Sequence, residues 1–155
     1  APVQSDFDKA MTDSLNEAIP VKSFELKDIR TFETSNQKDI DAYFVNLGNM
    51  NNKNSKRVSS DFLLAVARTV TEGNFDGLTD HTNMATNYIN DLLKIRVPKV
   101  WGPWHLSFIN LLQKRLTLAE AIIANHADDP VRVAVAVGQL SDTFDEEKAI
   151  LDVLN

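Results

Sequence analysis

The sequence of 155 residues contains no cysteine, which excludes disulfide bonds, thiolate nucleophiles and cysteine-ligated zinc. It has only five glycines and five prolines, and it contains no glycine-rich phosphate loop, dinucleotide fingerprint or serine nucleophile elbow. No apolar run approaches the length of about 18 residues that a membrane-spanning helix needs. We therefore predict no cofactor, no metal and no transmembrane segment within this sequence.

The composition is that of a folded protein. Hydrophobic residues make up 43% of the chain and charged residues 25%, so there are enough apolar side chains to build a core. The length predicts one domain over residues 1–155. The chain begins at Ala1 rather than at a methionine, which is typical either of a processed protein from which a signal or anchor was removed or of a fragment cut at a chosen boundary.

The net charge of −6 is concentrated in the C-terminal part of the chain. Residues 128–155 contain seven acidic side chains against Arg132 and Lys148, a net charge of −5. Nucleic-acid binders usually carry a basic surface, and phosphate backbones repel an acidic one. The nearest basic cluster, Lys53, Lys56 and Arg57, is better explained as part of a solvated loop. We therefore predict that nucleic acid is not a partner.

Apolar residues recur at helical spacing in the first third of the chain. A first helix is expected over residues 5–19, ended by Pro20, and residues 21–32 are expected to form an extended connection over the other helices. Ser35 is a suitable N-cap for a second helix. The run from Gly48 to Ser55 is so polar that it predicts a loop.

The middle of the chain predicts two further helices. The third begins after Ser59 or Ser60 and ends at Gly73, a residue suited to a left-handed C-cap. The fourth begins between residues 75 and 79 and runs to about Ile95. The residues of the third helix expected to face the core are Phe62, Leu63, Val66, Ala67 and Val70.

Prolines mark the starts of the last two helices. The fifth helix is expected to run from Pro103 to about His126, and the sixth to begin at Pro130 with Asp129 as its cap. The short turn between them predicts antiparallel neighbours. The side chains of the sixth helix expected to face the core are Val133, Val137, Leu140, Phe144, Leu151 and Leu154.

These elements together predict an all-α fold, an up-and-down bundle of about four longer helices plus shorter N-terminal helices. Residues 1–34 are expected to form an N-terminal helix and an extended connection that pack on the bundle.

The histidines and tryptophans are the first candidates for a site. His105 could act as a general base or a ligand, or it could be a packed residue that fixes the start of the fifth helix; the sequence shows no orienting acid for it, which favours packing. Trp101 and Trp104 could anchor a ligand or partner, or plug the end of the bundle. His81 and His126 have no second ligand at metal-binding helical spacing.

The acidic residues Asp142, Asp145, Glu146 and Glu147 are expected on the outer face of the last helix. They could bind a cation or a basic partner. However, adjacent helical residues diverge by about 100°, so the two glutamates do not converge on one point. We therefore interpret this acidic surface mainly as a solvated face.

Val97-Pro98 followed by His105, a long apolar helix and then Asp129-Pro130 resembles a group of uncharacterised helical proteins of candidate phyla radiation bacteria. These proteins are exported or membrane-anchored. The likeness extends from about Lys27 to the C-terminus and includes the segment Lys27-Asp28-Ile29. The resemblance implies an anchored ectodomain outside the cytoplasm, although the apolar anchor is absent from this chain. It implies no reaction.

The leading functional hypothesis is a non-enzymatic helical bundle with a structural or protein-partner-binding role, placed outside the cytoplasm or at the cell surface. The alternative is a carrier of a small hydrophobic ligand, with a cavity inside the bundle and Trp101, Trp104 and His105 at its mouth. A third hypothesis is a hydrolase that uses His105 with a distant acid.

Overall fold

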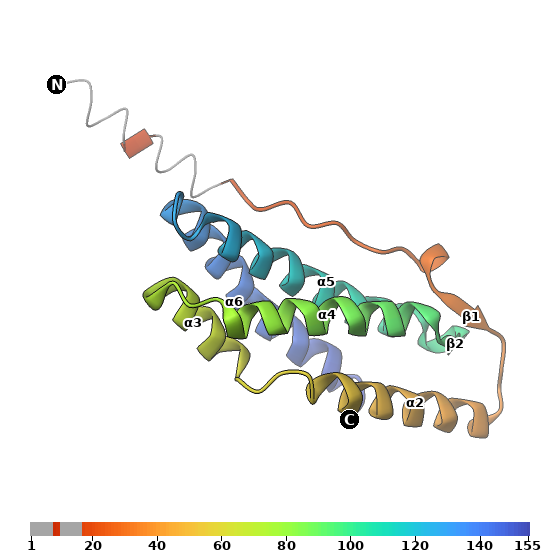
Figure 1. Ribbon diagram of the computed structural model, residues 1–155. Helices are drawn as coiled ribbons and strands as arrows, with labels where there is room; N and C mark the ends of the chain where they lie inside the picture. Colours follow the sequence, from red (N-terminus) through yellow and green to blue (C-terminus); the bar gives the residue numbers. More distant parts are fainter. Residues whose placement is uncertain (1–7, 10–16) are drawn as a thin grey trace.

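The computed structural model describes residues 8–9 and 17–155 and confirms the all-α bundle. Within these residues the helices, shown in Figure 1, are α2 (Gln37–Ser55), α3 (Phe62–Glu72), α4 (Asp76–Lys94), α5 (Gly102–Asn125) and α6 (Pro130–Asp152). The short elements are the 3-10 turns η1 (Leu26–Asp28) and η2 (Lys99–Trp101) and the strands β1 (Arg30–Phe32) and β2 (Arg96–Pro98). None of the helices in the described ranges has the length and apolar character needed to cross a membrane.

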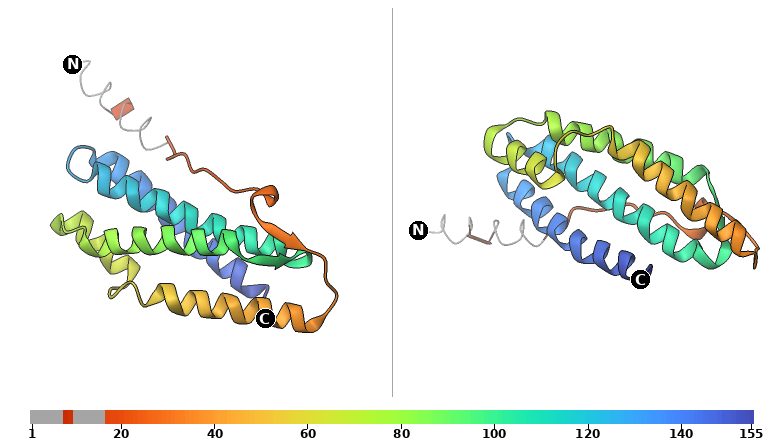
Figure 2. Two further views of the ribbon diagram at one scale, coloured as in Figure 1. Left: turned by 45° about the vertical axis from the view of Figure 1, so that its right-hand side comes forward. Right: turned by 90° about the horizontal axis from the view of Figure 1, so that it is seen from below.

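Helix α5 lies at the centre of the arrangement. It packs against α4 on one side and against α6 on the other, while α2 and α3 follow one another along α4. Figure 2 shows the same order from below, with α5 between α4 and α6. Among the described helices, α6 packs closely along α5 alone. As a consequence, no helix seals the space between α6 and the pair α2 and α3.

Two helix ends form as their sequence signals predicted. Asp129 caps α6, since its side chain accepts a hydrogen bond from the backbone N–H of Arg132 at 2.9 Å, and Pro130 opens the helix. Gly73 ends α3 with a φ of 64°, the left-handed conformation that glycine adopts without steric cost.

The predictions that serine caps the second and third helices were wrong. Asn36, not Ser35, caps α2 and accepts from the backbone N–H of Lys38 at 3.0 Å. Asp61 caps α3 in the same way. Ser60 contributes instead through its carbonyl oxygen, which lies 2.7 Å from Nε2 of His81. Asparagine and aspartate are as well suited to the N-cap position as serine.

The predicted loop from Gly48 to Ser55 is wrong, because these residues are the last turns of α2. Asn54 is fully buried, and its Nδ2 donates to the carbonyl oxygen of Met50 at 2.9 Å and to Asp91 of α4 at 3.3 Å. Lys53 Nζ lies 3.1 Å from the same carboxylate. These bonds to another helix offset the poor helix propensity of the asparagines.

The inward face of α3 differs from the predicted one. Its members follow the spacing i, i+3, i+4, i+7 and are Phe62, Ala65, Val66 and Thr69. Leu63, Ala67 and Val70 were predicted inward and are exposed. Gly77 of α4 sets this orientation, because a Cβ there would lie 3.3 Å from the Ala65 side chain and 3.0 Å from Ser60 Oγ. The two helices therefore meet through small residues.

Only two of the six residues predicted to form the core face of α6 are buried. Val133 and Leu140 are buried, but Val137, Phe144, Leu151 and Leu154 remain 36–48% exposed. These four side chains face the space between α6 and the pair α2 and α3, which we call the seam. Helical periodicity identified the apolar face, but no neighbouring helix covers it fully.

The extended connection predicted for residues 21–32 lies over α5 and α6 (Figure 1). Two side-chain amides hold the segment around it: Gln139 of α6 bonds both the N–H and the C=O of Ile19, at 2.6 and 3.1 Å, and Asn110 of α5 does the same for Phe24, at 2.7 and 3.1 Å. Each amide thus satisfies a backbone donor and a backbone acceptor that would otherwise be unpaired.

The sequence did not predict the small parallel sheet that ends this connection. Strand β1 pairs with β2 so that Arg30, Thr31 and Phe32 lie opposite Arg96, Val97 and Pro98. The helix predicted over residues 5–19 lies largely outside the described residues. Of the described residues in this range, 8–9 are helical and 17–19 are not.

We predict that Asp91→Asn loosens the end of α2. Burial raises the pKa of the Asp91 carboxyl, but the hydrogen bonds from Lys53 and Asn54 outweigh it and hold the pKa below its usual value. Removing this charge weakens both bonds, so the amides of residues 50–55 should exchange with solvent faster, by about tenfold for a loss of about 1.4 kcal/mol.

Hydrogen–deuterium exchange measures this effect residue by residue. Asp80→Asn, an exposed change on the same helix, is the matched control and should leave exchange in α2 unchanged. Equal protection of residues 50–55 in both variants would show that Asp91 does not hold this end of the helix.

Candidate functional site

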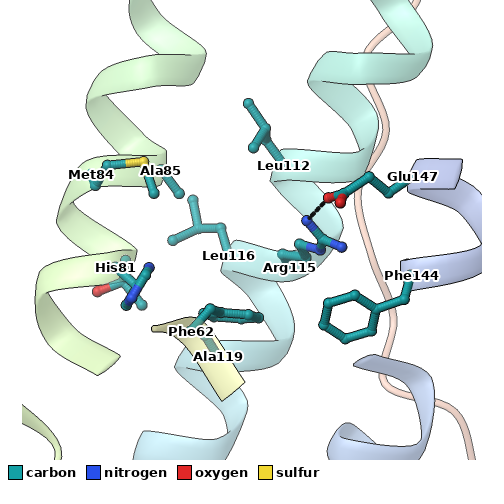
Figure 3. A pocket seen from close by; sticks show the side chains of 11 residues that line it. Phe62, His81, Met84, Ala85, Leu112, Arg115, Leu116, Ala119, Phe144 and Glu147 are labelled. Carbon is teal, nitrogen blue, oxygen red and sulfur yellow. Dashed lines mark hydrogen bonds and ion pairs between the residues drawn. The ribbon is translucent and has the colours of Figure 1, made fainter. Parts of the chain in front are cut away.

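The strongest candidate site is a partly open cavity of about 240 Å³ lined by residues of α3, α4, α5 and α6, which we call the central cavity. Figure 3 shows the side chains that line it. They are mostly apolar and comprise Phe62, His81, Thr82, Met84, Ala85, Leu112, Arg115, Leu116, Ala119, Phe144 and Glu147. The cavity lies in the seam, where α6 stands away from α3.

His81 supplies the α4 wall with one hydrogen-bonding atom. Its Nε2 lies 2.7 Å from the carbonyl oxygen of Ser60, and since a carbonyl can only accept, Nε2 carries the proton. The ring packs edge-on against Phe62 with centroids 5.2 Å apart. No described residue bonds Nδ1, so this atom can accept a hydrogen bond from a bound molecule.

Arg115 supplies the charge of the α5 wall, and several contacts hold its guanidinium. Nε donates to Thr143 Oγ1 at 3.0 Å and Nη2 to the Thr143 carbonyl oxygen at 3.4 Å. The guanidinium carbon lies 4.7 Å from the centre of the Phe144 ring. Nη1 donates to Glu147, the bond drawn in Figure 3. The cation is thus fixed at the edge of the cavity by α6.

The acidic residues of α6 divide into two pairs. Asp142 and Asp145 are exposed, as predicted for an outer face. Glu146 and Glu147 are not part of that face, because both turn towards α5: Glu146 pairs with Lys114 at 2.5 Å, and Glu147 pairs with Arg115. Each glutamate thus pairs with a different cation of α5.

Two further hollows follow the seam on either side of the central cavity. The α2 groove, about 440 Å³, contains Leu47 of α2, Trp104 of α5 and Leu151 of α6 among its walls. The α3 groove, about 340 Å³, lies between Val70 of α3 and Val137 of α6. Glu147 lines both the central cavity and the α2 groove. The Arg115–Glu147 pair therefore lies on the border between them.

His105 lies away from all of these hollows and is fully buried. Its Nε2 is 3.0 Å from the carbonyl oxygen of Leu92, so Nε2 carries the proton, and Nδ1 accepts from the Tyr43 hydroxyl at 2.8 Å. Burial lowers the pKa of the imidazole and outweighs the opposing effect of the Leu92 carbonyl. With both nitrogens engaged, His105 joins α2, α4 and α5 and has no free atom for a substrate.

Trp101 and Trp104 belong to an aromatic cluster at the end of the bundle. Phe44 lies 4.8 Å from Trp101 and 6.0 Å from Trp104, measured between ring centroids, and Trp104 stacks on Phe108 at 6.0 Å. The indole N–H of Trp104 donates to the carbonyl oxygen of Ile150 at 2.9 Å. None of Trp101, Trp104 and His105 lines the central cavity, and Trp104 alone reaches the α2 groove. These contacts favour the packing interpretation.

No metal-binding centre is found among residues 8–9 and 17–155. No group of three or more histidine, aspartate or glutamate side chains comes together there in a way that could hold an ion. The acids nearest to the central cavity are neutralised by Lys114 and Arg115.

The sequence did not point to the central cavity as a site. Among its lining residues, His81 was considered only as a metal ligand, Glu147 only as part of the acidic face, and Phe62 and Phe144 only as core side chains. A signal was available in Lys114-Arg115, a dibasic pair within the apolar stretch of α5. A neighbouring antiparallel helix that carries Glu146-Glu147 can neutralise such a pair. What the sequence could not show is that the helices leave space beside it.

The burial of His105 predicts a stability that depends on pH. The pKa of His105 in the folded state lies below its unfolded value of about 6.5. Its contribution to the free energy of unfolding is therefore complete above about pH 6.5 and is lost as the pH falls from about 6.5 through the folded-state pKa. His105→Gln cannot take up this proton. We expect the urea midpoint of the wild type to fall more than that of the variant between about pH 7.5 and about pH 5.

Circular dichroism during urea unfolding gives both midpoints. The difference between the two proteins isolates His105 from His81, His126 and the carboxylates, which both proteins share. Parallel pH curves for wild type and variant would mean that His105 is not held neutral by its surroundings.

Comparisons with protein-family models, with curated proteins and with solved structures found no match to this chain. The resemblance to helical proteins of candidate phyla radiation bacteria therefore stays a prediction. A functional proposal depends on the geometry of the residues described above.

Proposed function

We propose that this chain is a non-enzymatic helical-bundle domain that binds a compact, mainly apolar small molecule in the central cavity. The observation that carries the proposal is the cavity itself, whose walls come from four helices and are largely apolar. Tightly packed protein interiors leave few voids larger than a water molecule. A cavity of this size at the meeting point of four helices is therefore a candidate for a retained binding site.

The size of the central cavity defines what it can hold. Apolar cavities of about 150 Å³ already accommodate a molecule as large as benzene, and the cavity here measures about 240 Å³. Drug-sized ligands generally occupy pockets of about 300–1,000 Å³. We therefore infer a ligand built around a single substituted ring or a branched chain of similar volume.

The polar atoms of the cavity support recognition rather than catalysis. The Nε2 proton of His81 goes to a backbone carbonyl rather than to a carboxylate, so the ring lacks the acid that orients a catalytic histidine. Arg115 is already paired and stacked. Fixed donors and acceptors on an otherwise apolar wall are typical of a site that orients a ligand.

A protein partner is the second candidate. The observation in its favour is the row of side chains along the seam, Val137, Phe144, Leu151 and Leu154, which remain partly exposed although such apolar faces are usually covered. Placement outside the cytoplasm stays a prediction. The two candidates share Phe144, but a change that fills the central cavity leaves Val137, Leu151 and Leu154 of this row untouched.

Filling the cavity tests the first candidate. Ala119 is 1% exposed and lines the cavity from α5, so Ala119→Leu places a larger side chain inside it. We expect toluene, a neutral apolar probe, to shift the methyl NMR signals of Met84, Ala85 and Leu116 in the wild type. The variant should lose at least about 90% of this affinity, a tenfold change equivalent to about 1.4 kcal/mol.

The matched control is Ala124→Leu, which makes the same change at an exposed position of the same helix and should bind toluene like the wild type. Thermal unfolding of both variants shows whether the larger side chain disturbs the fold. If toluene leaves the cavity methyl signals of the wild type unshifted, the proposed function is wrong.

A further inference from the structure

We propose that the ligand of the central cavity is a small monocarboxylate, whose carboxylate replaces Glu147 on the guanidinium of Arg115 while its apolar body enters the cavity. This inference rests on the proposed function and adds the chemical class of the ligand. It follows from an asymmetry between the two members of the ion pair at the edge of the cavity.

Arg115 stays in place without Glu147. Two bonds to Thr143 and the stack on Phe144 hold its guanidinium independently of the carboxylate. Thr143 is itself fully buried, and its hydroxyl donates to the carbonyl oxygen of Leu140 at 2.6 Å. The Arg115 side chain is only 16% exposed. The site therefore holds an immobilised cation whose fork suits a carboxylate.

Glu147 is the member of the ion pair that can move. Its side chain is 40% exposed, and among the described residues it bonds to Arg115 alone. Because Glu147 also lines the α2 groove, its carboxylate has open space on the side away from the central cavity. A glutamate that swings into this space regains water, so the exchange leaves no charge buried without a partner.

A cationic ligand fits the central cavity less well than an anionic one. A cationic group would have to take Glu147 from Arg115 and leave the guanidinium unpaired between Thr143 and Phe144, where it cannot move into water. Unpaired buried charges are strongly unfavourable. An incoming carboxylate instead keeps the guanidinium neutralised and places the rest of the ligand against Leu112, Leu116 and Phe144.

The test compares 3-phenylpropionate with its neutral isostere 3-phenylpropanamide by calorimetric titration of the full chain at about pH 7, where the acid is ionised. The wild type should bind the acid more tightly than the amide. Glu147→Gln removes the competing carboxylate and should raise the affinity for the acid by about two- to fivefold, the range expected for a partly exposed ion pair. Affinity for the amide should stay within about twofold.

The matched control is Glu146→Gln, which breaks the neighbouring pair with Lys114 outside the central cavity and should leave both affinities unchanged. Arg115→Met should lower the affinity for the acid by about tenfold or more. Arg115→Lys retains the charge without the planar fork and should lie between Met and the wild type. This variant also separates a loss of charge from a loss of fold.

Each outcome decides one of the two proposals. If neither these probes nor toluene binds the wild type, the proposed function fails and this inference fails with it. If toluene binds but neither phenylpropyl probe does, only the carboxylate inference is overturned. If both probes bind equally well and Glu147→Gln changes neither affinity, ligand binding stands and the carboxylate preference is overturned.

Discussion

Helix α5 imposes the main constraint on this structure, because its apolar side chains surround most of its circumference. Ile109, Leu111, Leu118 and Ile122 are all at most 2% exposed, although they do not lie on one helical face. A helix that is apolar all round must be enclosed. Helices α4 and α6, together with α3 and the N-terminal extended segment, enclose it from different directions. The bundle is therefore organised around the single helix α5 and not around four equivalent helices.

The seam and its cavity follow from this arrangement. Helices α2 and α3 pack along α4, whereas α6 packs along α5, so the α6 face that carries Phe144 has no covering helix. Apolar residues there reduce contact with water only in part, and the remaining space includes the central cavity. A charged pair, Arg115 and Glu147, lies at its border. A guanidinium stacked on an aromatic ring tolerates such a half-buried position better than an ammonium group would.

Buried polar groups join the other helices to one another and hold the end of α2. The hydroxyl of Tyr43 and the carbonyl oxygen of Leu92 occupy both nitrogens of His105 and thereby join three helices at one point. Asn54 and Asp91 extend α2 through residues that have little helix propensity of their own. Because an unpaired polar group in the interior is costly, each of these contacts specifies one arrangement of helices and disfavours the alternatives.

The sequence by itself determined which segments are helical over most of the chain, the proline and aspartate start of α6, the glycine end of α3 and the all-α class, because these depend on local spacing and local steric preferences. It misjudged the end of α2, the caps of α2 and α3, and the burial of Val137, Phe144, Leu151 and Leu154. Only the tertiary structure decided those features, together with the small sheet and the central cavity. The physical reason is that periodicity reports the apolar side of a helix, whereas cover for that side, and partners for buried polar atoms, come from residues far away in the chain.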